Sequence, residues 1–224
     1  MFIPKPSRDS YNGPRDYRPI SLTLFLLKTM ERLVDTYLRD EVLALMPLHS
    51  NQHAYQAGKS VETALHQVDV RVEKVLDQRE IALGAFLDIE GAFNNTRCDT
   101  MCDALVRHGS EYTIVRWFKA TPEGRVAVAT LNEIALRFTI YRGCPQGGVL
   151  SPLLWCLVVN DLITRLSGGG VFIERNADDI CLLAVAKFPN TVSGIMQRVL
   201  STIKIWSNEV GLSVNPDKTA CCLY

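Results

Sequence analysis

The chain has 224 residues, of which 47% are hydrophobic and 21% are charged, as in ordinary globular proteins. At this length folding can bury roughly 70% of the unfolded surface, so we expect one substantial domain, with or without a smaller lobe. The 24 basic and 24 acidic residues cancel, so the overall charge indicates no nucleic-acid partner, and any such binding must use local basic patches.

The cysteines and the apolar segments argue against a secreted or membrane protein. The seven cysteines form an odd set without C-x-x-C pairs, unlike a disulfide framework. Cys98, Cys102 and His108 could be metal ligands, but a fourth ligand is not evident and thiols of the core or surface are the simpler interpretation. The longest uncharged run, 143–160, contains two prolines and a glycine cluster, and no signal peptide opens the chain. We therefore expect a soluble protein of a reducing, intracellular compartment.

The N-terminal third is expected to be a loop followed by two helices. The first twenty residues are rich in proline, glycine and charge, which predicts a loop. Apolar residues recur at helical spacing over 26–42, with Ser21 as a candidate cap and Pro47 as the stop. Ser60 is predicted to cap a second helix with an apolar stripe from residue 61 to 76.

The middle of the chain predicts a buried strand, two helices, a hairpin and a very apolar helix. The run "IALGAFLD", 81–88, is of strand length and ends in one acid, Asp88. Two helices are expected within 97–121, and apolar and polar residues alternate on both sides of Asn132, as in a hairpin. A glycine loop then leads into an apolar helix, with Ser151 as a possible N-cap and Pro152 at the first helical position.

The last third is expected to mix strands and one helix. Its elements are strands at about 171–174 and 179–186, a helix at about 190–209 and a strand near 219–224. Helices and strands alternate without the regular βαβ rhythm of a doubly wound fold, so the predicted class is α+β.

Two adjacent acids, Asp178 and Asp179, interrupt the apolar segment 171–188. In a flat strand they would point to opposite faces, whereas a tight turn lets both converge, so we predict a hairpin with the pair at its tip. Clustered carboxylates repel one another unless they are protonated or bridged by cations, and Asp88 at the end of a neighbouring strand would complete an oxygen-rich cage. Such a cage could hold two Mg²⁺ ions roughly 3.5–4 Å apart, as phosphoryl transfer requires. An Asp-Asp pair by itself more often lies on a solvated turn.

Six motifs together resemble a known family. Their sequences are "DYRPISL" (16–22), "QHAYQAGKSVETAL" (52–65), "FLDIEGAFNN" (86–95), "GCPQGGVLSPLLW" (143–155), "ADD" (177–179) and "GLSVNPDKT" (211–219). The last four occur in the order of the reverse transcriptase palm motifs, and the first two resemble the fingers of reverse transcriptases from non-LTR (LINE-type) retrotransposons. The resemblance covers nearly the whole chain.

The resemblance implies an α+β fold with a polymerase palm, an antiparallel sheet with packed helices, plus a mainly helical fingers lobe. It divides a single reverse transcriptase domain into a fingers-like segment, 1–80, and a palm-like segment, 81–224, in which part of the fingers could intervene. Relative to the family pattern, the domain is expected to be truncated at both ends and to lack the thumb.

The resemblance also implies catalytic roles. Asp88 and Asp178 match the two principal metal-binding aspartates, and Asp179 matches their companion, so these three would hold two Mg²⁺ ions, with Mn²⁺ as a possible replacement. Lys218 matches the lysine proposed to protonate the pyrophosphate leaving group as a general acid. A solvated lysine at the start of an edge strand is the alternative.

Substrate-binding roles follow from the same resemblance. Phe93 matches an aromatic residue that excludes a 2′-hydroxyl by bulk, and Gln146 and Gly147 lie in the loop that lines the nascent base pair. Arg18 and Lys59 match cations that neutralise the triphosphate or hold the template. The alternatives are a core aromatic for Phe93, a plain glycine turn for the loop and exposed surface charges for the two cations.

The implied function is that of an RNA-directed DNA polymerase, in which a primer 3′-hydroxyl attacks a deoxynucleotide. Its partners would be an RNA template, a DNA primer and deoxynucleoside triphosphates, with no membrane, and its location nuclear if it is part of an active retrotransposon. A degenerate, inactive remnant that at most binds nucleic acid is the main alternative. An RNA-dependent RNA polymerase shares the metal aspartates, but the "PQG" loop and the bulky Phe93 argue against it.

Two departures from the family pattern leave a degenerate element copy, an inactive domain and a tolerated variant as open interpretations. Relatives usually place an aromatic residue before Ala-Asp-Asp, commonly preceded by glycine, where this chain has Asn176 and Arg175. An arginine near the metal cage would add a competing cation. Gln56 stands where many relatives carry arginine.

Overall fold

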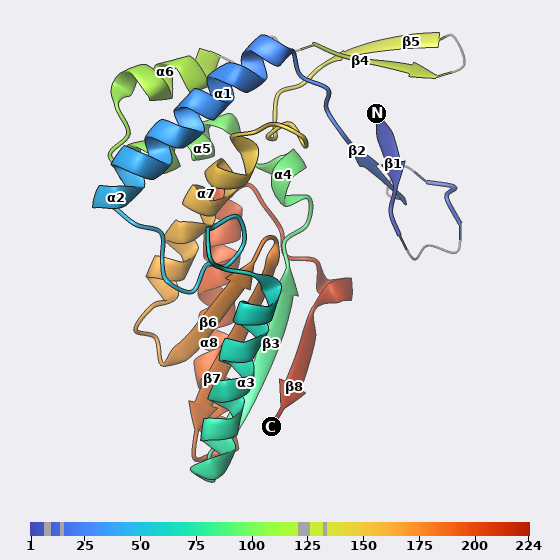
Figure 1. Ribbon diagram of the computed structural model, residues 1–224. Helices are drawn as coiled ribbons and strands as arrows, with labels where there is room; N and C mark the ends of the chain where they lie inside the picture. The colour runs from blue at the N-terminus through green and yellow to red at the C-terminus, as the bar shows by residue number, and fades with distance from the viewer. Residues whose placement is uncertain (7–9, 14–15, 121–125, 132–133) are drawn as a thin grey trace.

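A four-stranded antiparallel sheet with strand order β6-β7-β3-β8 forms the centre of the molecule (Figure 1). The computed structural model describes residues 1–224 except 7–9, 14–15, 121–125 and 132–133. The strands are β3 (Ile81–Asp88), β6 (Val171–Asn176), β7 (Asp179–Ala186) and β8 (Ala220–Leu223). The predicted strands are therefore confirmed, and so is the α+β class.

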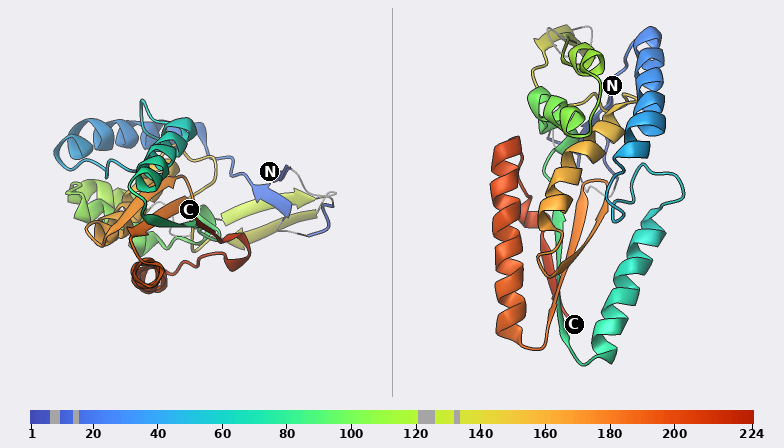
Figure 2. Two further views of the ribbon diagram at one scale, coloured as in Figure 1. Left: turned by 90° about the horizontal axis from the view of Figure 1, so that it is seen from below. Right: turned by 90° about the vertical axis from the view of Figure 1, so that its left-hand side faces the viewer.

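The sheet is covered on both faces by helices, which explains why its central strands are apolar runs rather than alternating ones. Helix α3 (Val61–Asp77) lies on one face and α8 (Pro189–Val210) on the other, as Figure 2 shows from the side. On the α3 face Ala82 and Leu183 pack against Val75. Although α3 belongs to the segment expected to be fingers, it contacts β3 and β6. The division at residue 80 stays a prediction.

Helix α7 (Ser151–Leu166) is the most buried helix of the described chain, with most of its side chains in the main core. It packs against α5 (Cys98–Arg107) and α8, while α6 (Tyr112–Ala120) packs on α5. A helix that is apolar all round requires neighbours on every side, and α7 has them. The two helices predicted within 97–121 are confirmed.

The end of the molecule opposite the C-terminus carries α1 (Phe25–Tyr37) and two strand pairs (Figures 1 and 2). A π-helical turn (Leu38–Val42) and α2 (Leu43–Leu45) continue α1. Strand β1 (Phe2–Pro4) pairs with β2 (Tyr17–Pro19), and β4 (Val126–Leu131) with β5 (Ile134–Thr139). The predicted hairpin around Asn132 is confirmed in its strands, whereas Asn132 itself lies outside the described residues. The predicted N-terminal loop instead contains the β1–β2 pair.

One predicted helix cap is confirmed and two are wrong. Ser60 accepts a hydrogen bond from the Thr63 amide in a capping box at the start of α3. Helix α1 begins after Leu24, and the Ser21 amide donates to the Gln146 carbonyl oxygen at 2.7 Å. Ser151 is the first residue of α7, and its hydroxyl donates to the Pro145 carbonyl oxygen. Both serines thus hold the loop before α7. No helix among the described residues has the length and hydropathy needed to cross a bilayer.

Candidate active site

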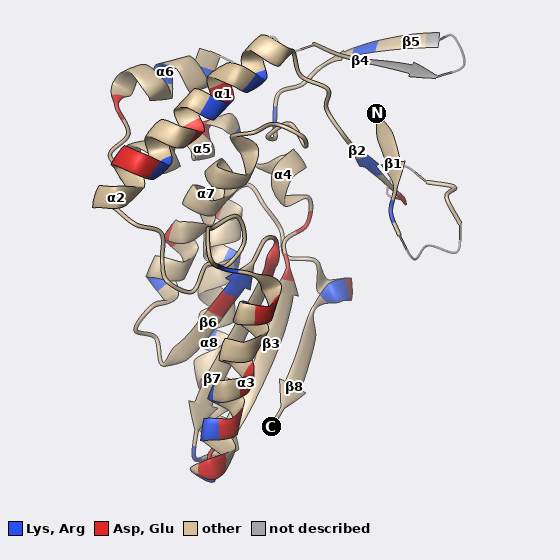
Figure 3. Ribbon diagram, in the orientation of Figure 1, with Lys and Arg blue, Asp and Glu red and all other residues tan. Residues whose placement is uncertain are grey.

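Three carboxylates meet where the central strands end. Asp88 is the last residue of β3, and the antiparallel register places Asp179, the first residue of β7, directly opposite it. Asp178 lies in the two-residue turn between β6 and β7, after Ala177, whose φ is 56°. The Trp155 indole donates to the Ala177 carbonyl oxygen at 3.0 Å. The predicted hairpin with the acidic pair at its tip is confirmed, and Figure 3 shows acidic segments where β3 and β7 meet.

Lys218 is the cation of this cluster. It lies on a 3-10 turn (Pro216–Lys218), and its ammonium donates to Asp88 Oδ1 at 2.8 Å. This hydrogen bond, with the charges of Asp88, Asp178 and Asp179, raises the pKa of Lys218, so it keeps its proton at neutral pH. Burial, Asp178 and Asp88 together raise the pKa of Asp179 above its ordinary value. One ammonium cannot neutralise three carboxylates, so the cluster attracts further cations.

The three acids do not form a preformed metal cage. Within the described part of the chain, no three His, Cys, Asp or Glu side chains are arranged to hold an ion. Asp88 and Asp178 line the same cavity of about 240 Å³, whereas Asp179 lines a separate cavity with Asp88 and Lys218. Carboxylate oxygens whose repulsion is only partly relieved are suitable donors for Mg²⁺ or Mn²⁺. Asp88 and Asp178 are therefore the donors that fit an ion in the cavity of about 240 Å³.

Most of the predicted substrate-binding residues line this cavity of about 240 Å³, hereafter the acidic pocket. Its lining includes Arg18, Asp88, Phe93, Gln146, Asp178 and Lys218, together with Lys5 and Tyr17. Basic segments on β2 and on the 3-10 turn before β8 both lie to the right of the acidic tip in Figure 3, with β2 above the turn. Side chains from distant segments thus meet around one space that has both acids and cations.

Lys59 and Gly147 do not line the acidic pocket. The Lys59 ammonium donates to the carbonyl oxygens of Ser50 and Gln52, and burial lowers its pKa. Lys59 therefore closes its own loop. Gly147 has φ 101°, and a Cβ there would lie 2.9 Å from the Ser21 carbonyl oxygen, so glycine is required for this close approach.

Phe93 lies on the one-turn helix α4 (Ala92–Asn95) with aromatic rings on two sides. Its ring centroid is 6.4 Å from that of Tyr55, nearly perpendicular, and 6.2 Å from that of Trp155. The Cys144 amide donates to the Phe93 carbonyl oxygen at 2.7 Å. Phe93 is half-buried, so it is part of the core and also a wall of the pocket.

The loop before α7 is held so that Gln146 faces the pocket. Glu31 of α1, which is 5% exposed, accepts a hydrogen bond from the Val149 amide at 2.6 Å. The Gln146 carbonyl oxygen accepts from the Ser21 amide. The Gln146 Oε1 atom is buried and has no hydrogen-bond partner. A buried polar atom without a partner is costly, so Gln146 offers an acceptor to a ligand of the pocket.

The expectation that Arg175 lies near the carboxylates as a competing cation is wrong. Its side chain is 1% exposed and is absent from the pocket lining. The guanidinium carbon lies 5.5 Å from the centroid of Trp155, and Nη1 donates to Gln52. The reason is strand alternation, because Arg175 shares the face of Ile173, which packs in the main core. Asn176 is half-buried and pairs with Asp179 across the hairpin.

The cysteines near α5 act as core thiols. Burial, with a smaller contribution from Cys98, raises the pKa of Cys102 to about 12, so its thiol stays protonated. A protonated thiol is a poor metal ligand. The His108 ring, through Nδ1, lies 2.9 Å from the Ala104 carbonyl oxygen.

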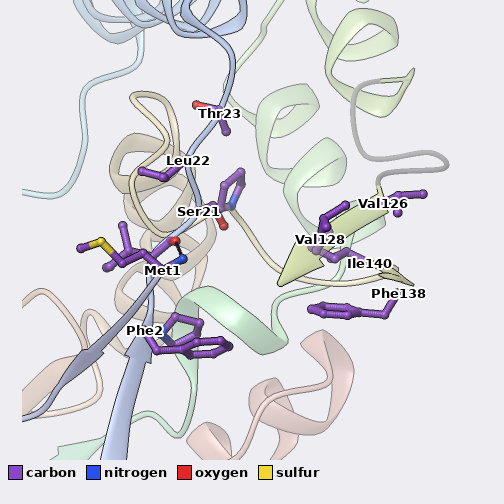
Figure 4. Close-up of a pocket in the computed structure, with 13 residues that line it drawn as sticks. Met1, Phe2, Ser21, Leu22, Thr23, Val126, Val128, Phe138 and Ile140 are labelled. Carbon is purple, nitrogen blue, oxygen red and sulfur yellow. Dashed lines mark hydrogen bonds between the residues drawn. The ribbon is translucent and has the colours of Figure 1, made fainter. Parts of the chain in front are cut away.

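A larger cavity of about 460 Å³ lies between the β1–β2 and β4–β5 pairs. Figure 4 shows Met1 and Phe2 on one side of it and Val126, Val128 and Phe138 on the other. No side chain of its lining is acidic or basic, and its one dashed contact is the amino terminus donating to Ile20. This cavity is larger than the acidic pocket but has no carboxylate or imidazole for proton transfer or metal binding.

Comparison with known proteins agrees with this geometry. The model of the family described as "Reverse transcriptase (RNA-dependent DNA polymerase)" matches residues 3–223. The chain belongs to the reverse transcriptase family.

Curated relatives of this reverse transcriptase domain come from insect non-LTR retrotransposons. A "Probable RNA-directed DNA polymerase from transposon BS" of Drosophila melanogaster is 27% identical over 98% of the chain and 25% of that protein. A Pol polyprotein from type-1 retrotransposable element R1 of Bradysia coprophila is 30% identical over 95% of the chain and 21% of that protein. The chain therefore spans about a quarter or less of these relatives.

Solved structures similar to the domain include telomerases. The structure of a telomerase from Candida tropicalis with a TWJ fragment of telomeric RNA has a TM-score of 0.61 and 12% identity, covering 88% of this chain and 33% of that one. A Candida albicans telomerase has a TM-score of 0.61 and 14% identity, covering 99% and 41%. This likeness shows a shared palm and fingers fold.

Three residues around the candidate site act through packing and were not predicted from the sequence. Tyr55 and Trp155 stand inside quoted motifs, yet their contacts with Phe93 could not be deduced from spacing. Glu31 lies on α1, outside the six motifs. The only sequence feature that could have indicated its role is that it is an acidic residue on the buried face of this helix.

Proposed function

We propose that this reverse transcriptase domain is the nucleotidyl-transfer centre of a retrotransposon RNA-directed DNA polymerase. The observation that carries the proposal is that Asp88, Asp178 and Lys218 line one pocket with Phe93 and Gln146. The first three suit the chemistry at the phosphate, and the last two suit recognition of the nucleotide. In this reaction the primer 3′-hydroxyl attacks the α-phosphorus of a deoxynucleotide, forming a phosphodiester bond while pyrophosphate leaves.

The acids and the lysine have separate roles in this proposal. Asp88 and Asp178, with Asp179 beside them, would hold two Mg²⁺ ions, for which Mn²⁺ is a replacement. When bound, such ions stabilise the charge that develops on the attacking and leaving oxygens. Lys218 is protonated at neutral pH and can give its proton to the leaving pyrophosphate.

The remaining pocket residues would select and hold the nucleotide. Phe93 would exclude a 2′-hydroxyl by bulk, which favours deoxynucleotides and counts against an RNA polymerase. Gln146 would donate or accept at the sugar or the template base, with Gly147 allowing its loop to approach Ser21. Arg18 would neutralise triphosphate oxygens. Lys59 would shape the neighbouring loop, since its ammonium donates within that loop.

The partners of the proposed enzyme are an RNA template, a DNA primer and deoxynucleoside triphosphates. Because the chain has no net charge, its affinity for nucleic acid would come from cations around the pocket and depend on salt. A polymerase of a mobile element that copies into chromosomes would act in the nucleus.

A second candidate is a non-catalytic remnant that binds nucleic acid. It is favoured by Asn176, which replaces the family's aromatic ring, and by Lys218, whose ammonium occupies one oxygen of Asp88. The two candidates differ in turnover. In a remnant, Asn176→Tyr produces no extension, whereas an enzyme weakened by this residue gains rate.

Primer extension on an RNA template with Mg²⁺ tests the chemistry. We expect incorporation by the unaltered chain and its loss in Asp178→Ala. Asp103→Ala, at an exposed aspartate of α5, is the matched control and should retain incorporation. Extension that persists unchanged in Asp178→Ala contradicts the assigned chemistry, and Mn²⁺ binding measured by titration reports the same carboxylates without turnover.

A further inference from the structure

The loop of residues 49–60, hereafter the clamp loop, is tied to strand β6 through Arg175. The Arg175 amide donates to the Asn51 carbonyl oxygen at 3.0 Å, and the His53 amide donates to the Arg175 carbonyl oxygen at 2.9 Å. Gln52 thereby forms a parallel bridge with Arg175. This bridge attaches a loop that precedes α3 to the strand that leads into the acidic turn.

The Arg175 side chain reinforces this attachment from inside the core. Its Nη1 donates to the Gln52 side chain, and its guanidinium lies over the ring of Trp155. Nε and Nη2 have no hydrogen-bond partner, although the side chain is 1% exposed. Burying a partly unpaired charge costs stability, and an apolar residue of similar volume would cost less. The arginine at this position is therefore better explained by what it holds than by the stability it adds.

The clamp loop presents Tyr55 to Phe93. Tyr55 has φ 61°, a left-handed conformation that is unfavourable for a residue with a large side chain. The Arg39 guanidinium donates to the Tyr55 carbonyl oxygen at 3.1 Å, which helps to hold this conformation. The Tyr55 ring then meets Phe93 edge to face. Burial, followed by the charge of Asp178, raises the pKa of Tyr55, so the hydroxyl also lies in the field of the acidic turn.

Four side chains form a continuous series of contacts, and backbone hydrogen bonds link the last of them to the loop that carries the first. Tyr55 contacts Phe93, Phe93 contacts Trp155, and Trp155 lies under the guanidinium of Arg175. Arg175 returns to the clamp loop through the hydrogen bonds of its backbone. Phe93 lies on a helix of one turn, which by itself fixes a side chain poorly. Its ring instead contacts both Tyr55 and Trp155.

We propose that Tyr55 is a positioning residue that fixes the ring of Phe93, and that Arg175 keeps Tyr55 in place. The inference rests on the proposed function, in which Phe93 excludes the 2′-hydroxyl. Exclusion by bulk requires a ring that cannot swing aside, and Tyr55 adds an edge-to-face contact with Phe93 to the contact that Trp155 makes. Without Tyr55 the ring gains freedom, and the pocket admits ribonucleotides more readily.

Selectivity for deoxynucleotides over ribonucleotides is the measurement to use, because a residue with a merely structural role would leave this selectivity unchanged. We would measure kcat/KM for a deoxynucleotide and for the matching ribonucleotide with the full chain. Tyr55→Ala should lower the ratio by about tenfold, the scale of discrimination at a single contact. Tyr55→Phe should retain the ratio of the unaltered chain, because it keeps the ring that contacts Phe93. Arg175→Met and Gln52→Ala should lower the ratio in the same direction. Tyr112→Ala, at an exposed tyrosine of α6, is the matched control.

Hydrogen exchange separates failure of this inference from failure of the proposed function. Arg175→Met and Gln52→Ala should speed exchange of the His53 amide, and Tyr55→Ala should speed exchange of the Asn94 and Asn95 amides, while α8 stays protected. If exchange changes in this way in a chain that incorporates no nucleotide, the positioning stands and the polymerase proposal fails. A selectivity ratio unchanged in Tyr55→Ala, or unaltered exchange around Phe93, overturns the positioning.

Discussion

The acids and the cations of the candidate site are held in different ways. Asp88 and Asp179 stand opposite each other in paired central strands, and Asp88 is 13% exposed. Lys218 lies on a single 3-10 turn with 60% of its side chain exposed, and Arg18 lies on a strand of three residues. A ladder of hydrogen bonds fixes register, whereas a short turn does not. The comparison indicates that Asp88 and Asp179 are the fixed part of the centre, whereas Lys218 and Arg18, and Asp178 in its two-residue turn, are held less firmly.

The largest expected effect is the loss of nucleotide incorporation when Asp88, one of the acids fixed by the sheet, is substituted. Asp88→Asn keeps the size of the side chain and removes its charge, so incorporation should fall by about 10³-fold, the scale seen when one preorganised electrostatic group is lost. The fold should persist, because one repulsive carboxylate has been removed beside Asp179. Steady-state primer extension and urea unfolding measure the two effects. A variant that extends primers normally would show that Asp88 is outside the chemistry.

A smaller loss of incorporation is expected when Lys218, on its short turn, is substituted. Lys218→Met should lower incorporation by about 10²-fold, as for the loss of one general acid. It should also raise the pKa of Asp179 further, because the Lys218 charge currently lowers it. Carboxyl titration by NMR follows that pKa, and Lys74→Met, at an exposed lysine of α3, serves as control. If Lys74→Met loses as much rate, the assignment of Lys218 is wrong.

The loops around the site depend on close backbone approaches that a methyl group would break. A Cβ on Gly143, at φ 84°, would lie 2.6 Å from the Asn94 carbonyl oxygen and 2.8 Å from that of Phe93. Gly143→Ala should lower the free energy of unfolding by about 1–3 kcal/mol. Gly58→Ala has a comparable φ of 74° and nothing within 4 Å, so it isolates the backbone strain. Equal losses in urea unfolding would mean that the close approach costs nothing.

The smallest effect concerns the contact between the clamp loop and the sheet. His53 Nε2 lies 2.6 Å from Glu174 Oε1, and both side chains are buried. Burial raises the pKa of Glu174 to about 8 and lowers that of His53 below 6.5. Between about pH 6.5 and 8 the unfolded chain has already released the Glu174 proton that the folded chain retains. Stability should therefore fall as pH rises in this range, by at most about 1.4 kcal/mol per pH unit.

Urea unfolding at several pH values checks this dependence. Below about pH 6.5 His53 is protonated more readily in the unfolded chain than in the folded chain, because its pKa is lowered on folding. The contribution of His53 to stability therefore rises with pH in this range, opposite to that of Glu174. Glu174→Gln should flatten the upper range. A slope that is unchanged in Glu174→Gln would place the titrating group elsewhere.

Much of the fold could be predicted because its signals are local. The run 81–88 and the hairpin around Asp178 were predicted from apolar length and turn geometry, and Ser60 from its position before an apolar stripe. The pocket lining was anticipated for Arg18, Phe93, Gln146, Asp88 and Asp178 because their motifs occur together in one family.

The sequence by itself determined the elements of the central sheet and its helices, their order and the acids at the strand ends, because periodicity and turn chemistry act between neighbouring residues. Only the tertiary structure decided that Ser21 serves the loop of Gln146 instead of a helix, and that Arg175 points into the core toward Gln52. These contacts join residues more than one hundred positions apart, and the competition for each hydrogen bond is settled by packing that no local pattern records.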